Sequence, residues 1–127
     1  MPKILVVDDE EGIRRVLVEF LAKMGFEIIQ ASGGEEAIEL LRPGLEMDLM
    51  VIDMKMPKVG GLEVLKEKKN LNDVRPVIIL TGSIDAEEYY SSGLKELGLG
   101  PGDVIYKPVD LFSLLDTVKK KLHMAIE

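Results

Sequence analysis

Short strand-like segments, separated by longer segments of mixed polarity, recur five times along this 127-residue chain and constrain its fold more than any other feature. These segments are Ile4–Val7, Glu27–Ala31, Leu49–Ile52, Val77–Leu80 and Val104–Tyr106. Most are continuous apolar runs rich in Val, Ile and Leu, which are typical of strands buried on both faces of a parallel sheet. The pattern therefore predicts an α/β fold.

The intervening segments predict helices, because their apolar residues recur at spacings of three and four. The first stripe comprises Ile13, Val16, Leu17, Phe20, Leu21 and Met24, and the last comprises Leu111, Leu114, Leu115, Val118 and Leu122. Shorter stretches include Ala37–Leu41 and Leu62–Leu65, and a weaker one follows Asp85. Five strands are thus expected to alternate with five helices.

Strict alternation of strands and helices indicates parallel pairing through right-handed crossovers. We expect residues 1–127 to form a single domain, built on a doubly wound five-stranded parallel sheet of order 2-1-3-4-5 with five flanking helices. In such a sheet every strand ends at the same edge, and a ligand crevice opens there between the first and third strands.

Polar residues stand at the ends of four of these strands: Asp8-Asp9, Asp53, Thr81 and Lys107. The three carboxylates would repel one another in one crevice, so they need a cation, a shared proton or separation into water. Mg²⁺ meets this need, with Mn²⁺ as an alternative, because it prefers oxygen ligands and is usually held by one or two carboxylates and a phosphate oxygen.

Such a centre favours phosphoryl transfer, in which a carboxylate can be the attacking group. Asp53 is the residue best placed to form an aspartyl phosphate. The Thr81 hydroxyl and the Lys107 ammonium would then bind phosphoryl oxygens.

The charge balance excludes several other classes of function. Sixteen Lys and Arg against 23 Asp and Glu give a formal net charge of −7, which disfavours direct contact with nucleic acid or an anionic membrane surface. No apolar run approaches the length of a membrane span, no signal peptide precedes the first strand, and cysteine is absent. We therefore expect a soluble, cytoplasmic protein.

Four motifs in this order and spacing resemble those of the receiver domain of two-component response regulators. They are Asp8-Asp9, the stretch Asp53-Met54-Lys55-Met56-Pro57 through Gly61, Thr81-Gly82, and Lys107-Pro108. The resemblance extends from Met1 to about His123 and implies the flavodoxin-like receiver fold.

The resemblance also implies a role for each of these residues. Asp53 would be the phosphoacceptor, and Asp9 and Asp53 would ligate Mg²⁺, with Asp8 acting mainly through a bound water. The backbone carbonyl of Lys55 would complete the protein ligands. Thr81 and Lys107 would bind the phosphoryl group, and the Lys107–Pro108 peptide would be cis.

One position departs from the family. Most receivers carry Tyr or Phe three residues before the lysine of the fifth strand, where its rotation reports phosphorylation to an interaction surface. This chain has Val104 there. Because strand side chains alternate, Tyr106 lies on the same face as Val104 and is a candidate substitute for the signal relay.

The family further implies a histidine kinase or phosphotransfer protein as phosphodonor, a downstream effector protein or domain, and a phosphorylation-dependent homodimer as one mode of output. Such a protein is a switch that gains and loses its own phosphoryl group rather than a turnover enzyme. Two alternatives remain open: a receiver-like interaction module that is never phosphorylated, and a Mg²⁺-dependent aspartyl-phosphate phosphatase. Haloacid-dehalogenase-type phosphatases have an Asp two residues after the nucleophile, where this chain has Lys55.

Overall fold

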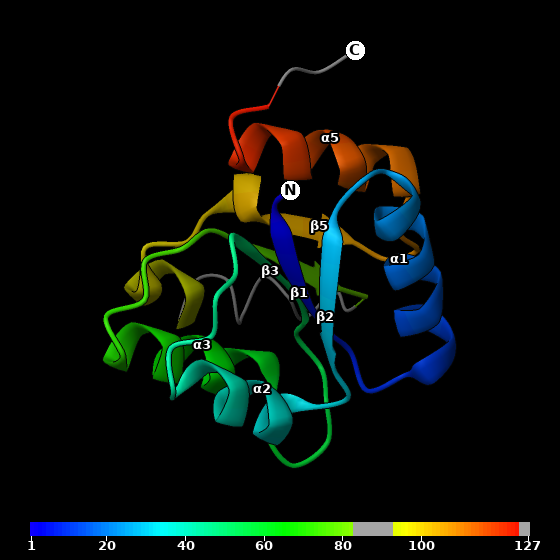
Figure 1. Cartoon of the computed structure of the whole chain (residues 1–127). Coiled ribbons are helices and arrows are strands. Elements are labelled where there is room, and N and C mark those ends of the chain that lie inside the picture. Colours follow the sequence, from blue (N-terminus) through cyan, green and yellow to red (C-terminus); the bar gives the residue numbers. More distant parts are fainter. Residues whose placement is uncertain (83–92, 125–127) are drawn as a thin grey trace.

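The computed structural model describes residues 1–82 and 93–124, which are arranged around one five-stranded parallel sheet (Figure 1). The strands are β1 Lys3–Val7, β2 Glu27–Ala31, β3 Leu49–Asp53, β4 Val77–Thr81 and β5 Val104–Tyr106. Their order is β2-β1-β3-β4-β5, as the alternating pattern predicts. The doubly wound topology is therefore confirmed.

Four α-helices lie within the described residues: α1 Glu11–Lys23, α2 Gly34–Leu41, α3 Gly61–Asn70 and α5 Leu111–Lys121. The helix predicted after Asp85 lies outside them. Before β5, the chain forms two short 3₁₀ helices, Lys95–Leu97 and Pro101–Asp103. None of the described helices combines the length and the hydropathy that crossing a bilayer requires.

Alternating side chains of the central strands supply two separate cores, one on each face of the sheet. Leu5, Met50 and Ile79 point into the core that α2 and α3 cover. Ile4, Val51 and Ile78 point into the core that α1 and α5 cover (Figure 1). Every residue of β3 and β4 is buried, which holds the ends of these strands in fixed register.

The apolar stripe predicted for α1 is only partly buried. Leu17 and Leu21 are fully covered, whereas Val16 and Met24 are 52% and 42% exposed. The helix contacts β1 and β2 at one side of the sheet, together with α5, and this contact covers only the middle of the stripe. The helical face that these residues share is therefore buried at its middle and open at Val16 and Met24.

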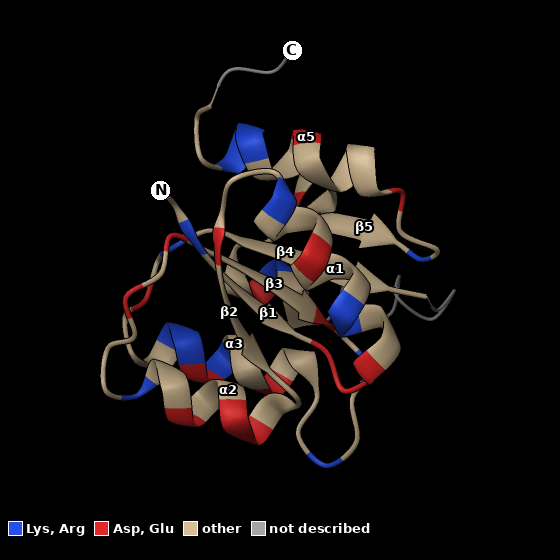
Figure 2. Cartoon of the chain, turned by 45° about the vertical axis from the view of Figure 1, so that its right-hand side comes forward, with Lys and Arg blue, Asp and Glu red and all other residues tan. Residues whose placement is uncertain are grey.

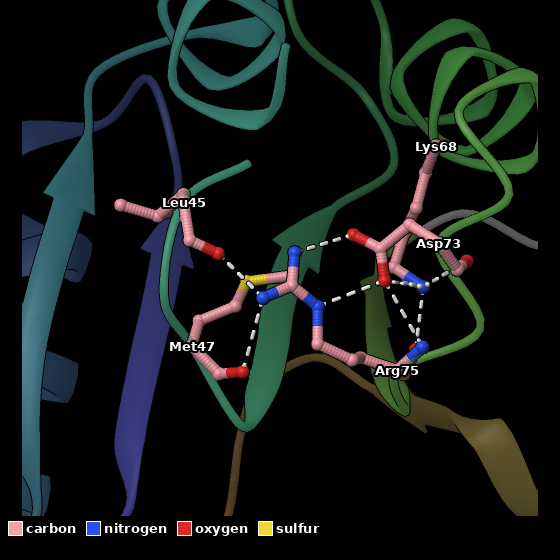
Figure 3. A network of polar contacts seen from close by, with 5 residues as sticks. All are labelled: Leu45, Met47, Lys68, Asp73 and Arg75. Carbon is pink, nitrogen blue, oxygen red and sulfur yellow. Dashed lines mark hydrogen bonds and ion pairs between the residues drawn. The ribbon is translucent and has the colours of Figure 1, made fainter. Parts of the chain in front are cut away.

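A polar network ties together the segments that lead into β3 and β4 (Figure 3). The Arg75 guanidinium donates to both carboxylate oxygens of Asp73, at 2.9 and 2.7 Å, and to the carbonyls of Leu45 and Met47. The Lys68 ammonium donates to the carbonyls of Asp73 and Arg75. The network thereby fixes the starts of the two strands that end at Asp53 and Thr81.

The pKa values of Asp73 and Lys68 in this network are both lowered, but for different reasons. Burial alone would raise the pKa of the Asp73 carboxyl, but the hydrogen bonds and charge of Arg75, with the charge of Lys68, outweigh it and lower the pKa to about 2. Burial lowers the pKa of Lys68, and the nearby Asp73 carboxylate offsets this effect only in part. Arg75 is therefore the principal partner of Asp73.

This pKa predicts an acid-dependent loss of stability. The Asp73 carboxyl has a pKa of about 3.9 in an unfolded chain, so the unfolded state binds more protons than the folded state between about pH 4 and pH 2. The stabilisation that the charged Asp73 carboxylate gives to the folded state is complete above about pH 4 and is lost as the pH falls towards about 2. In urea unfolding, Asp73→Asn should be less stable than wild type at pH 5, and the gap should narrow towards pH 2. A gap independent of pH would contradict the prediction.

Candidate functional site

Four strand ends meet at the carboxyl edge of the sheet and bring together residues far apart in sequence. Asp8 follows β1, Asp53 ends β3, Thr81 ends β4 and Lys107 follows β5. Asp8, Asp53 and Thr81 are almost fully buried, with exposures of 0%, 3% and 5%. The positions predicted to converge therefore do so.

The acidic cluster of the crevice consists of Asp8, Asp9 and Asp53. Each offers one carboxylate oxygen, and these oxygens lie within 4.8 Å of one another. The Lys107 Nζ atom lies 3.1 Å from Oδ2 of Asp53 and 3.8 Å from Oδ2 of Asp8. Three carboxylates and one ammonium give this crevice a formal charge of −2.

The electrostatics of Asp8 reflect this excess of negative charge. Burial raises the pKa of the Asp8 carboxyl, and the nearby charges of Asp53 and Asp9 raise it further. The backbone N–H of Glu10, which donates to Oδ1 at 2.9 Å, and the Lys107 charge act in the opposite direction without restoring the usual value. The hydrogen bond and the positive charge that the protein supplies therefore do not fully offset the cost of burying a negative charge on Asp8.

The same crevice favours the charged form of Lys107, whereas it disfavours the charged form of Asp8. Burial would lower the pKa of its ammonium, but the hydrogen bond and charge of Asp53, followed by the charge of Asp8, outweigh burial and raise the pKa. Its backbone N–H donates to the Thr81 carbonyl at 2.7 Å, which joins the ends of β4 and β5. The peptide bond between Lys107 and Pro108 is cis.

The residues of the acidic cluster fit a magnesium ion on two counts. Opposite ligands of an octahedral Mg²⁺ are separated by about 4.2 Å, so oxygens that lie within 4.8 Å of one another need only small shifts or a bridging water to share one ion. In addition, Oδ2 of Asp8 is buried and accepts no hydrogen bond from the described residues, and the Lys107 Nζ atom lies 3.8 Å from it. A divalent cation would also neutralise the formal charge of the crevice.

Other predicted residues lie near the crevice without a demonstrated role. Lys55 is exposed in the loop between β3 and α3. Val104 packs partly against the core beneath α2 and α3, whereas Tyr106 is 55% exposed and pairs in register with Thr81. Tyr106 therefore lies beside Thr81 on the neighbouring strand.

Arg14 is a contributor that the sequence did not reveal. Its Nη1 donates to the Asp8 carbonyl at 2.8 Å and its Nε to the Gln30 side chain at 3.0 Å. These bonds hold the turn that carries Asp8 and Asp9 against β2. Arginines on exposed helical turns are common, so its position in the sequence gave no signal.

Gly61 is a second residue whose role emerges only in the structure. Its amide donates to the Met54 carbonyl at 2.9 Å, and a Cβ atom at this position would lie 2.6 Å from the Asp53 carbonyl oxygen. Because both contacts are with backbone, no side-chain rotation could relieve the clash. Glycine at this position therefore allows α3 to begin directly against the strand end that carries Asp53.

Adding a methyl group at Gly61 should consequently be costly. We expect Gly61→Ala to lower the free energy of unfolding by about 1–3 kcal/mol, the usual range for overpacking. Gly12→Ala is the matched control, since a Cβ there meets nothing within 4 Å and alanine favours helix by up to about 1 kcal/mol. Urea unfolding measures both variants, and equal stabilities would contradict the assigned role of Gly61.

Comparison with known proteins agrees with this geometry. Residues 4–119 match the family described as the response regulator receiver domain. The chain is 38% identical over 125 residues to sporulation initiation phosphotransferase F of Bacillus subtilis, an alignment that covers 96% of this chain and 94% of that protein. It is 41% identical over 106 residues to the probable transcriptional regulator ycf27 of Porphyridium aerugineum, covering 84% of this chain but only 42% of the relative.

Solved structures show the same similarity. A response regulator receiver domain protein from Clostridium thermocellum aligns with a TM-score of 0.84 and 31% identity, covering 97% of this chain and 95% of that one. The response regulator TrrA of Thermotoga maritima, solved in complex with Mg²⁺-BeF, aligns with a TM-score of 0.80 and 35% identity, covering 95% and 99%.

The matched range contains the four polar strand ends and all of the strand residues apart from Lys3, which begins β1. The chain therefore belongs to the response regulator receiver domain family of two-component signalling proteins.

Proposed function

We propose that this receiver domain is a Mg²⁺-dependent phosphoacceptor switch in which Asp53 takes up the phosphoryl group. The observation that carries the proposal is the contact of Lys107 with Asp53 at 3.1 Å, inside a crevice that also holds Asp8 and Asp9. A buried carboxylate beside an ammonium and two further carboxylates is suited to accept a phosphoryl group once a divalent cation is present.

In this mechanism, Asp9 and Asp53 would hold the cation, Asp8 would act mainly through a bound water, and the Lys55 carbonyl would supply a further oxygen. When bound, Mg²⁺ (or Mn²⁺) neutralises charge on the phosphoryl oxygens and the carboxylates. A carboxylate oxygen of Asp53 attacks phosphorus. The new O–P bond forms as the bond from phosphorus to the donor atom breaks, and the electron pair of that bond leaves with the donor.

The phosphoryl group would then bias the conformation of the domain. Thr81 lies at the end of β4 and Lys107 at the end of β5, where a hydroxyl and an ammonium can donate to phosphoryl oxygens. Hydrogen bonds to charged groups contribute roughly 1.5–3 kcal/mol each, so the two together supply much of the ~5.5 kcal/mol needed to invert a strongly biased equilibrium. Partner binding would supply the remainder.

Tyr106 is our candidate for relaying this change, in place of the aromatic residue that most receivers carry at the position of Val104. Its ring is 55% exposed and lies one strand away from Thr81, in register with it. A shift of Thr81 towards a phosphoryl group would therefore alter the surroundings of this ring and the surface around it.

The proposed partners follow from this role. The phosphodonor would be a cytoplasmic histidine kinase or phosphotransfer protein, and the output an effector protein or domain, or a homodimer formed on phosphorylation. The chain spans less than half of ycf27, so the output of such longer relatives does not transfer to it directly. The domain itself would gain and lose its phosphoryl group without turning over an external substrate.

Incubation with acetyl phosphate tests this function. With Mg²⁺ present, phosphate-affinity electrophoresis should show a shifted band, and removing the metal with EDTA should abolish the shift. A band that never shifts would indicate an interaction module that is not phosphorylated. Sustained release of phosphate without a shifted band would indicate a phosphatase instead.

A further inference from the structure

A hollow of about 500 Å³ lies at the opposite edge of the sheet, where β4 and β5 begin. Its volume falls within the range of pockets that hold small molecules. Within the described residues, the hollow and the acidic cluster have no residue in common. Its walls come from α3 and the α3–β4 connection on one side, and from residues 97–103 and the end of α5 on the other.

The charges around this hollow differ from those of the chain as a whole. Four cations line it, Lys68, Lys69, Arg75 and Lys121, but only two carboxylates, Asp73 and Asp103. The lining therefore has a formal charge of +2, in a chain of net charge −7. Figure 2 shows basic segments on α3 and at the end of α5, in contrast to the acidic segments of α2.

Each of the four cations already has a partner in the protein. Lys68 is only 6% exposed, and it shares the Asp73 carboxylate with Arg75, so this trio carries one excess positive charge (Figure 3). Lys69 donates to the Glu96 carbonyl at 3.0 Å, which spans the hollow from α3 to the Lys95–Leu97 turn. Binding an anion there would therefore cost little additional ordering of these side chains.

Apart from Asn72, the remaining lining side chains are apolar. Leu65 and Val77 come from α3 and β4, and Leu97 and Leu99 from the segment that precedes β5. Lys121 closes the far side through its ion pair with Asp103. A ligand that fits both features needs an anionic group for the cations and an apolar body for the leucine and valine side chains.

We propose that this hollow binds a small organic anion, in which a carboxylate, sulfonate or phosphate monoester is attached to an apolar body. The excess positive charge around an apolar wall selects against neutral compounds and against inorganic ions that lack such a body. The site would function whether or not Asp53 is phosphorylated, because it lies at the other end of the strands.

The fluorescent probe 8-anilinonaphthalene-1-sulfonate tests the proposal, since it carries one sulfonate on an aromatic body. Titration of ¹⁵N-labelled protein should give saturable amide shifts confined to the residues around the hollow, including Val77 and Leu99. N-phenyl-1-naphthylamine, which has the same body without the sulfonate, should bind at least about tenfold more weakly.

The double variant Lys69→Gln with Lys121→Gln should weaken the probe at least about tenfold, since tenfold is 1.4 kcal/mol and two charge-assisted hydrogen bonds are worth more than this. Lys66→Gln with Lys119→Gln is the matched control, because it removes the same charge from the same two helices outside the lining of the hollow. If the test variant does not fold, Lys69→Gln alone serves, as this residue is exposed.

Several outcomes would overturn the proposal. These are amide shifts elsewhere on the protein, equal binding of the neutral compound, or equal weakening by the two double variants. Binding of a glutamate-rich peptide at these amides in the absence of probe binding would also overturn it, in favour of a docking site for an acidic protein segment. None of these results depends on the phosphorylation of Asp53, so this proposal and the proposed function fail separately.

Discussion

Asp53→Asn is expected to abolish phosphoryl uptake from acetyl phosphate, with a fall in labelling rate of at least about 1,000-fold, as is usual when an enzyme loses its nucleophile. The amide oxygen that replaces the carboxylate is neutral and cannot form the acyl phosphate. Quantitative phosphate-affinity electrophoresis, with the intact mass as a second measure, gives the labelled fraction over time.

The matched control is Asp116→Asn, which makes the same change at an exposed position of α5 far from the crevice. It should be labelled at the wild-type rate. The Asp53 variant should remain folded, because the change removes one of three mutually repelling carboxylates, although Lys107 loses its partner at 3.1 Å. Labelling of the folded Asp53 variant at the wild-type rate would show that the phosphoryl group resides on another residue.

Arg75→Ala should produce the largest loss of stability among the changes considered, about 3–5 kcal/mol. The guanidinium satisfies the Asp73 carboxylate and two backbone carbonyls 28 and 30 residues away in sequence. Its removal takes this donor away from both carbonyls and leaves the Asp73 carboxylate with only Lys68 and the backbone N–H of residue 75 as partners among the described residues. Since small domains are stable by only about 5–15 kcal/mol, the variant should unfold at a much lower urea concentration.

Arg42→Ala provides the comparison for this loss. Arg42 also pairs with one carboxylate, Glu67 at 3.3 Å, but its side chain is 63% exposed and bonds no backbone carbonyl of the described residues. An exposed pair of this kind is worth at most about 1 kcal/mol. Similar urea midpoints for the two variants would mean that the Arg75 network contributes no more than a surface ion pair.

The topology and the crevice could be predicted because they depend on very few quantities. Once strands alternate with helices, the direction of every strand is set, and the residues at the ends of the central strands must share an edge. The placement of Asp8, Asp53, Thr81 and Lys107 follows from this rule together with the lengths of four apolar runs.

The Arg75 network could not be predicted in the same way. Its partners Leu45 and Met47 offer only backbone carbonyls, which every residue possesses, so no residue type marks them. Lys68 in the sequence looks like an ordinary exposed helical lysine, yet it is 6% exposed because the α3–β4 connection folds over it. The exposure of Val16 has a related cause: periodicity indicates which residues share a helix face, but not how much of that face a neighbour covers.

The acidic crevice draws its members from residue 8 to residue 107, and this has a consequence during biosynthesis. A nascent chain whose β5 has not yet left the ribosome already has the carboxylates of Asp8, Asp9 and Asp53. It still lacks the Lys107 ammonium, whose Nζ atom lies 3.1 Å from Asp53 in the complete domain. Closing a loop of this length is among the last and slowest steps of assembly. Under the proposed function, a polypeptide that does not yet include Lys107 would therefore lack one of the two donors to the phosphoryl group.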